Sequence, residues 1–218
     1  MTQLTEIYQR LLDRYGTRNW WPAETPFEVV IGAILTQNTN WKNVEKAIAN
    51  LRDSGALTCE AICTLPQPEL EELIRPSGFF RQKAQRLHLF SCYLRDNFNS
   101  DLKSMLQQPL AKVRAELLEQ KGIGPETADS ILLYAGDRPS FVVDAYTGRL
   151  FSRLGLLDVT KKYQQIRNFF MDRLPPDTAL YNEYHALIVI HCKEHCRKRP
   201  ACQNCPLEKI CTYLQQNP

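Results

Sequence analysis

The sequence predicts an all-α protein, because its apolar residues recur at helical spacing along nearly the whole chain. Short β-like runs such as 141–143 are isolated, and the turn signals that join the strands of a sheet do not recur. The chain has 218 residues, of which 44% are hydrophobic, so it can bury a substantial core as one domain or as two small lobes.

Proline, glycine and polar residues divide this pattern into separate helices. Pro66 opens a short helix that ends at 76–78, and a long helix follows from about Arg81. The other helices that we expect cover residues 4–12, 27–34, 44–51, 113–118, 128–134, 146–154, 163–174 and 180–190.

The amino-terminal segment carries Glu6 and no apolar stretch, so it does not resemble a secretory signal. The longest apolar run, 27–35, is interrupted by Glu28 and is too short to span a bilayer. We therefore expect a cytoplasmic protein without membrane contact, associated with the nucleoid if its source is prokaryotic. We also expect it to be monomeric.

The formal net charge of +3 is concentrated at the carboxyl end of the chain. Five lysines and arginines stand against two glutamates between 191 and 218, so this segment accounts for the whole excess. A local basic patch suits contact with phosphate groups, although a solvated charged loop would explain the composition equally well.

A glycine-flanked turn joins two helical patterns within 118–128. Gly122 and Gly124 allow backbone conformations closed to other residues, and Pro125 suits the first position of the following helix. Such a turn presents N–H groups at the positive end of a helix, where an anion binds, while Ile123 can anchor it in the core. A purely structural turn is the competing interpretation.

Asp144 follows the apolar run 141–143 and precedes a helical pattern, so its default role is that of an N-cap. A cap also holds a carboxylate at a fixed place. Hydrolysis of a glycosidic bond passes through an oxocarbenium-like state, which such a carboxylate can stabilise while it orients water. The two roles are compatible.

Five of the eight cysteines lie close together: Cys192, Cys196, Cys202, Cys205 and Cys211. The pattern Cys-x5-Cys-x2-Cys-x5-Cys over 196–211 offers four thiolates for a [4Fe–4S] cluster, and structural zinc is the rival. We interpret the other three, Cys59, Cys63 and Cys92, as small buried apolar residues. A disulfide framework is not expected in a chain without a secretion signal.

The hairpin at 122–128, its distance from Asp144 and the sequence Val-Val-Asp together resemble the helix-hairpin-helix DNA glycosylases of the endonuclease III superfamily. The resemblance implies a base excision repair enzyme that binds double-stranded DNA containing a damaged base and hydrolyses its N-glycosidic bond. Asp144 would be the catalytic acid. The resemblance also implies two helical lobes, a six-helix domain over 28–138 with the hairpin and an iron–sulfur cluster domain formed by 1–27 with 139–218.

The same resemblance implies roles in DNA contact. Gly122, Ile123 and Gly124 would grip the DNA backbone, Gln37 would fill the gap left by the flipped base, and Phe79 would enter the opposite strand as a wedge. Without the resemblance, helix capping would be the default role for Gln37 and core packing for Phe79.

The family's cysteine spacing favours an iron–sulfur cluster over zinc. The implied ligands are Cys196, Cys202, Cys205 and Cys211. The first gap is one residue shorter than in the family, yet Cys196 aligns better than Cys192 because a basic stretch follows it. In that stretch Arg197, Lys198 and Arg199 would contact phosphate groups.

Further motifs resemble the 3-methyladenine DNA glycosylase III subfamily, whose best-known form lacks the cluster. Trp41 matches its stacking aromatic, and Trp20, Trp21 and Pro22 match its pocket wall. Aromatic faces attract a cationic alkylated purine, which makes 3-methyladenine the expected base. Glu126 stands where bifunctional members carry a Schiff-base lysine, which implies a monofunctional glycosylase without lyase activity.

Two alternatives remain open. One is a glycosylase for oxidised pyrimidines or for mismatched thymine or uracil. The other is a non-catalytic, structure-specific DNA-binding protein, against which the presence of Asp144 argues.

Overall fold

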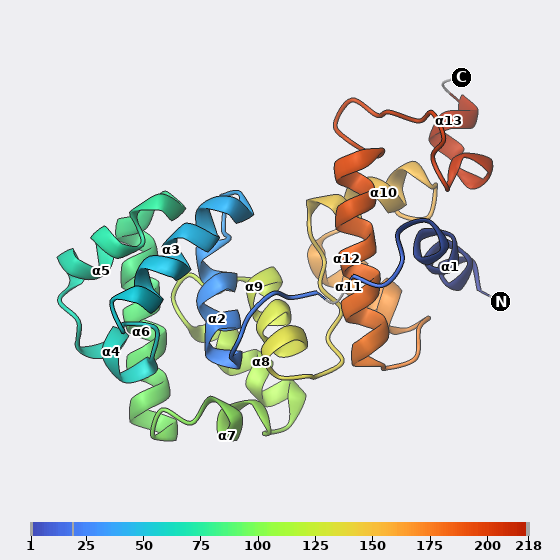
Figure 1. Ribbon diagram of the computed structural model, residues 1–218. Helices are drawn as coiled ribbons and strands as arrows, with labels where there is room; N and C mark the ends of the chain where they lie inside the picture. The colour runs from blue at the N-terminus through green and yellow to red at the C-terminus, as the bar shows by residue number, and fades with distance from the viewer. Residues whose placement is uncertain (1, 19, 217–218) are drawn as a thin grey trace. The chain divides into compact units, whose positions relative to one another are not determined.

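The computed structural model describes residues 2–18 and 20–216, and every regular element within them is helical. The all-α prediction is therefore confirmed. The chain forms two compact units (Figure 1): unit 1 comprises 1–22 with 139–218, and unit 2 comprises 23–138. Residues 23–27, which the sequence groups with the other lobe, belong to unit 2, where the Thr25 side chain caps a helix by accepting from the Glu28 amide.

Unit 2 is a helical bundle followed by the hairpin. Its elements are α2 (Pro26–Leu35), α3 (Trp41–Asp53), α4 (Cys59–Thr64), α5 (Gln67–Leu73), η1 (Arg75–Ser77), α6 (Phe80–Phe98), α7 (Leu102–Leu106), α8 (Leu110–Glu119), α9 (Pro125–Ser130) and the π-helical η2 (Ile131–Ala135). The expected count of six helices did not include α4 and α7. Each is too short for its apolar residues to display a helical period.

Helix α2 forms the centre of unit 2 (Figure 1) and packs against α3, α6, α9 and η2. Its sequence is apolar on every face except at Glu28, and residues 28–35 are all buried, as expected for a helix without a polar stripe. Its one acidic residue, Glu28, is buried as well. A guanidinium nitrogen of Arg52 on α3 lies 2.9 Å from the Glu28 carboxylate and compensates its charge.

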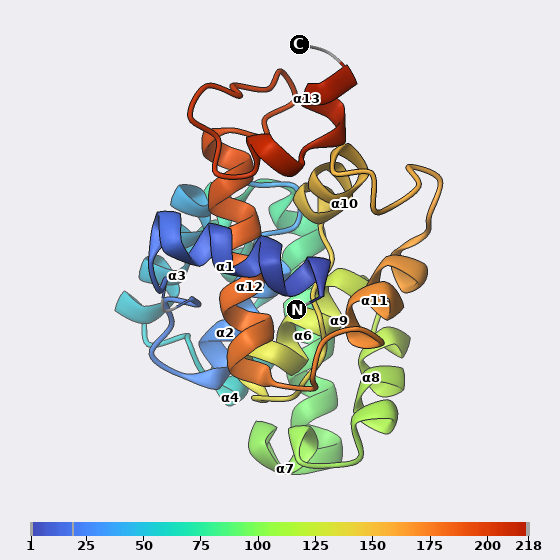
Figure 2. The same ribbon diagram turned by 90° about the vertical axis from the view of Figure 1, so that its right-hand side faces the viewer.

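Unit 1 contains the two ends of the described chain. Its elements are α1 (Gln3–Tyr15), α10 (Ala145–Arg153), α11 (Tyr163–Met171), α12 (Thr178–Glu194), η3 (Glu208–Ile210) and α13 (Thr212–Gln216). Helix α12 packs against α1 and α10 (Figure 2). Stacked rings of Phe141 and Phe170, 4.1 Å apart, fill the core, and the Tyr184 hydroxyl donates to the Leu4 carbonyl.

The isolated cysteines differ from their sequence interpretation. Cys59 is buried as expected, but Cys63 of α4 and Cys92 of α6 are half-buried and joined by a disulfide. The two helices pack closely together, so the Cα atoms of these two cysteines, which are 29 residues apart in the sequence, lie 5.3 Å from each other.

Lys83 of α6 is 1% exposed and joins two turns of unit 2. Its amine donates to the carbonyl of Leu35, at the end of α2, at 2.8 Å and to the carbonyl of Ser77 at 2.7 Å. Burial, with a smaller contribution from Arg86, lowers the pKa of the Lys83 amine to about 8. The amine supplies donors for two backbone carbonyls that α2 and η1 leave without helical partners.

Removal of this amine tests the effect of burial on its pKa. Between about pH 8 and pH 10.4 the unfolded chain binds more protons at Lys83 than the folded chain does, so folding gains stability as the pH rises. The free energy of unfolding of the wild type relative to Lys83→Met should rise by up to about 1.4 kcal/mol per pH unit in this range. Denaturant unfolding at several pH values measures it.

Lys42→Met is the matched control, because Lys42 is exposed on α3. If the difference in free energy of unfolding between the wild type and Lys83→Met does not change with pH over this range, the pKa of the Lys83 amine is not lowered by burial.

Candidate functional site

The hairpin between α8 and α9 has the backbone that its glycines predict. Gly122 adopts a φ of +86°, and a Cβ there would collide with the side chain of Arg86. Ile123 is 4% exposed and its amide donates to the Gln120 carbonyl at 3.0 Å, so it anchors the turn in the core. The close approach of Arg86 and the positive φ together require glycine at position 122.

Gly124 is the N-cap residue of α9, and Pro125 is at its first position. Within the described part of the chain no side chain caps this end.

Gln37 lies in the turn between α2 and α3 and is tied to the hairpin. Its side-chain amide donates to the Gly122 carbonyl at 3.0 Å and to the Thr127 hydroxyl at 2.9 Å. Arg86 of α6 donates to the amide oxygen of Gln37. Unit 2 therefore brings together two segments that the sequence assigns to DNA contact, the turn with Gln37 and the hairpin.

Phe79 immediately precedes α6 and is 63% exposed. Its φ of +46° lies in the left-handed region, where a bulky side chain is strained. An exposed aromatic ring in a strained backbone contributes little to folding, which is consistent with a role in binding.

Asp144 caps α10 in unit 1. Its carboxylate accepts from the amide of Thr147 at 2.7 Å and from the Thr147 hydroxyl at 2.9 Å, and the Asp144 amide donates to the Thr147 hydroxyl oxygen at 3.4 Å, which completes a capping box. Its other oxygen lies 3.5 Å from the Nε2 atom of His185 on α12, and the carboxylate side chain is 13% exposed.

The surroundings of Asp144 keep its carboxyl ionised. Burial alone would raise its pKa, but the contacts with His185 and with Thr147 outweigh burial and lower the pKa below its ordinary value. His185 is a candidate site residue that the sequence analysis missed, because a single histidine within an apolar helix is normally a core residue. Its one signal was a polar side chain on a buried face of α12.

The aromatic residues proposed for a base pocket are partly exposed within their own units. Trp41 opens α3 in unit 2, and its indole N–H donates to the Glu45 carboxylate at 2.8 Å. In unit 1 the rings of Trp20 and Trp21 meet edge to face with centroids 6.4 Å apart, and Pro22 is exposed.

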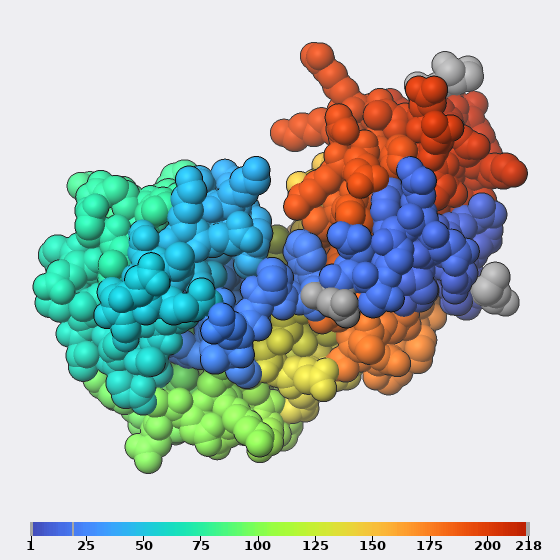
Figure 3. Space-filling model, in the orientation of Figure 1, coloured from blue at the N-terminus to red at the C-terminus, as the bar shows by residue number. Residues whose placement is uncertain are grey.

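A basic loop follows α12. Its residues Arg197, Lys198 and Arg199 are exposed, and long side chains project from the orange-red part of the chain that holds the loop (Figure 3). Arg153 of α10 shapes the loop backbone, because its guanidinium donates to the carbonyls of Arg197 at 2.7 Å and Lys198 at 3.0 Å.

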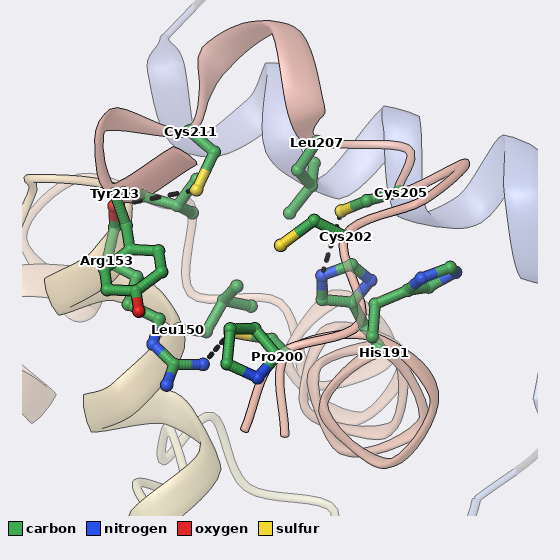
Figure 4. A pocket seen from close by; sticks show the side chains of 12 residues that line it. Leu150, Arg153, His191, Pro200, Cys202, Cys205, Leu207, Cys211 and Tyr213 are labelled. Atoms are coloured by element: carbon green, nitrogen blue, oxygen red, sulfur yellow. Dashed lines mark hydrogen bonds between the residues drawn. The ribbon is translucent and has the colours of Figure 1, made fainter. Parts of the chain in front are cut away.

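Four cysteine thiols line one pocket at the carboxyl end of unit 1 (Figure 4). They are Cys196, Cys202, Cys205 and Cys211. The pocket is also lined by Leu150, Leu154 and Leu207, with Arg153 and His191 at its edge. Among residues 2–18 and 20–216, no three cysteine, histidine or acidic side chains stand close enough to hold a metal ion. The thiols thus face one pocket without being gathered at ligand distances.

Cys192 lies outside this lining and is 1% exposed. Its contact with Cys196, together with the Arg153 guanidinium 3.3 Å from the Cys196 sulfur, lowers the pKa of Cys196. A thiol that ionises readily is a suitable metal ligand, whereas burial raises the pKa of the Cys202 and Cys205 thiols.

A family model described as "HhH-GPD superfamily base excision DNA repair protein" matches residues 31–176. The match covers more than half of the chain, so the chain belongs to the HhH-GPD superfamily of base excision DNA repair proteins. It is a DNA glycosylase of that superfamily, and the resemblance seen in the sequence is confirmed.

Relatives of known name agree with this assignment. A protein of Methanocaldococcus jannaschii named as a DNA repair glycosylase is 53% identical over 207 residues, which cover 94% of each chain. Endonuclease III of Sulfolobus acidocaldarius is 28% identical over 193 residues, which cover 88% of this chain and 83% of that protein.

Solved structures are similar as well. The 3-methyladenine DNA glycosylase of H. pylori, bound to 1,N6-ethenoadenine, matches with a TM-score of 0.77 and 31% identity over 88% of this chain and 98% of its own. A non-covalent complex of endonuclease III with DNA matches with a TM-score of 0.84 over 100% and 99% of the two chains. At 23% identity this second match shows the fold alone. No helix within the described residues is both long and apolar enough to cross a membrane.

The strain at Phe79 predicts an unusual effect on stability. Asparagine tolerates left-handed backbone, so Phe79→Asn should leave the free energy of unfolding unchanged or raise it by up to about 1 kcal/mol. Denaturant unfolding measures the change. Phe80→Asn is the matched control, because Phe80 lies within α6 with the Arg75 guanidinium 4.7 Å from its ring, and its loss should destabilise by about 1–2 kcal/mol. Equal destabilisation by both substitutions would show that Phe79 is a packing residue.

Proposed function

We propose that this glycosylase is monofunctional and releases an alkylated purine, in the first place 3-methyladenine, from duplex DNA. The observation that carries the proposal is the half-buried, ionised carboxylate of Asp144, held by Thr147 and His185. An N-cap alone does not need a second partner on another helix, whereas a catalytic carboxylate must be fixed in both position and charge.

Asp144 acts on the positive charge that develops on the sugar as the glycosidic bond breaks. Its ionised carboxylate stabilises the oxocarbenium-like state and orients the water that attacks it. Thr147 fixes one carboxylate oxygen and His185 faces the other. Neither residue needs to touch the DNA for this role.

The absence of a lysine at the nucleophile position supports a glycosylase without lyase activity. Glu126, exposed in the first turn of α9, occupies the position, and a carboxylate cannot form an imine with the sugar. Lys121 is also exposed but lies on the other side of the hairpin glycines.

The proposed base rests on two observations. The H. pylori 3-methyladenine DNA glycosylase is 31% identical and covers most of the chain. Trp41 offers a partly exposed indole at the start of α3, four residues beyond Gln37, and Trp20 and Trp21 offer further aromatic faces. Alkylated adenine is cationic, so stacking on such faces would contribute on the order of 1–2 kcal/mol when desolvated.

DNA contact in this proposal involves four features. The hairpin amides and the basic loop 197–199 bind phosphate groups without reading sequence. Phe79 enters the opposite strand as the exposed wedge, and Gln37 fills the vacated position. We propose that the protein binds one duplex as a monomer.

We further propose that Cys196, Cys202, Cys205 and Cys211 hold a [4Fe–4S] cluster. The four thiols line one apolar pocket, and Cys192 is outside it. When bound, the cluster would cross-link four points of the loop and so hold its basic side chains in place.

Incubation with duplexes that each carry one defined lesion tests the proposed reaction. We expect release of 3-methyladenine, its loss in Asp144→Asn with DNA binding retained, and no covalent adduct with borohydride. Trp41→Ala should reduce release strongly, while Trp41→Phe keeps part of it because the stacking face remains.

Two results would contradict this proposal. Efficient removal of thymine glycol or mismatched thymine without release of 3-methyladenine would assign the enzyme to another lesion. A robust borohydride adduct would show lyase chemistry, and Lys121→Ala would then locate the amine.

The cluster ligands are tested by iron and sulfide analysis of the purified protein. Cys196→Ser should lose iron and visible absorbance, and Cys192→Ser is the matched control that should keep both. Stoichiometric zinc without iron after anaerobic reconstitution would identify a zinc site. Retention of the cluster in Cys196→Ser would show that the first ligand was assigned wrongly.

A further inference from the structure

Two cationic side chains on one face of α6 connect the segments that the proposed function assigns to opening the duplex. Lys83 holds the carbonyls of Leu35 and Ser77. Leu35 lies two residues before Gln37, and Ser77 lies two residues before Phe79. One buried amine therefore fixes the backbone that leads into each of these residues.

Arg86 lies three residues beyond Lys83 and acts on the side chain of Gln37 itself. It donates to the amide oxygen of Gln37, and its own side chain lies across Gly122. The two N–H groups of Gln37 have acceptors in the Gly122 carbonyl and the Thr127 hydroxyl. The one acceptor and both donors of the Gln37 amide thus have partners, so its orientation is fixed.

We propose that Arg86 and Lys83 are positioning residues that hold Gln37, Phe79 and the hairpin in one arrangement before DNA binds. The proposal rests on the proposed roles of Gln37 and Phe79. A side chain that is already oriented loses less conformational freedom when it enters the duplex, so preorganisation lowers the barrier to base extrusion. Neither Arg86 nor Lys83 touches the DNA in this role.

A double-mutant cycle on Arg86 and Gln37 tests the proposal. Arg86→Met should lower the single-turnover rate of base release about tenfold, the loss expected for one hydrogen bond that involves a charged group. Affinity for undamaged duplex should change little, since it depends on phosphate contacts. In a Gln37→Ala background Arg86→Met should have little further effect, because it acts through Gln37.

Arg95→Met is the matched control on the same helix, where Arg95 is exposed and pairs with the neighbouring Asp96. Its rate should equal that of the wild type. If Arg86→Met proves unstable in denaturant unfolding, Arg86→Lys keeps the charge and loses the planar guanidinium contact. Additive losses, or an unchanged rate in both Arg86 variants, overturn the inference.

A second readout does not depend on activity. In the DNA-free protein the side-chain amide resonances of Gln37 should shift in Arg86→Met and stay in place in Arg95→Met. Unshifted resonances in Arg86→Met overturn the inference. An unchanged single-turnover rate in Gln37→Ala overturns the proposed role of Gln37 instead, so the two failures are told apart.

Lys83→Met extends the test to the backbone. With 2-aminopurine beside the lesion, the fluorescence change on base extrusion should be smaller or slower than in the wild type, although Lys83→Met remains folded by denaturant unfolding. Lys42→Met, the exposed control on α3, should match the wild type. An unaltered fluorescence change in folded Lys83→Met overturns the part of the proposal that concerns Lys83.

Discussion

The pair of hydrogen bonds from the Lys83 amine to the carbonyls of Leu35 and Ser77 fixes the two segments of unit 2 that lead to Gln37 and Phe79. Residues 28–35 of α2 are buried, so the carbonyls at its carboxyl end cannot rely on water. A cation from the neighbouring helix satisfies one of them and, at the same time, holds the turn that leads to Phe79. A requirement of folding, the pairing of buried polar groups, thus also fixes the residues that the proposed activity needs.

Asp144 in unit 1 likewise serves both folding and the proposed activity. Helix α10 needs an N-cap, and the capping geometry fixes a carboxylate whose charge is maintained by His185 and Thr147. Capping therefore does not compete with catalysis in this interpretation. It supplies the fixed position, while His185 from α12 favours the ionised form in spite of burial.

Sequence patterns predicted the features that depend on neighbouring residues and missed those that depend on distant ones. The long helices α6 and α12 show their period over several turns, and the hairpin is marked by its glycines. Helices α4 and α7 are too short to show a period. The contact between Arg86 and Gln37 joins residues 49 apart, and Cys63 and Cys92 are 29 apart, so only the packing of helices reveals either pair.

Helix α10 links the proposed acid to the basic loop within unit 1. Its nine residues span about 13 Å, with Asp144 at the start and Arg153 at the end. Arg149 donates to the Cys196 carbonyl at 2.8 Å, and Arg153 donates to the carbonyls of Arg197 and Lys198. The loop's own basic side chains, Arg197, Lys198 and Arg199, are exposed, and the Arg197 guanidinium donates to the Lys193 carbonyl at 3.0 Å. The arginines of α10 thus shape the loop, and the proposed phosphate contacts are assigned to the separate set of basic side chains that the loop itself carries.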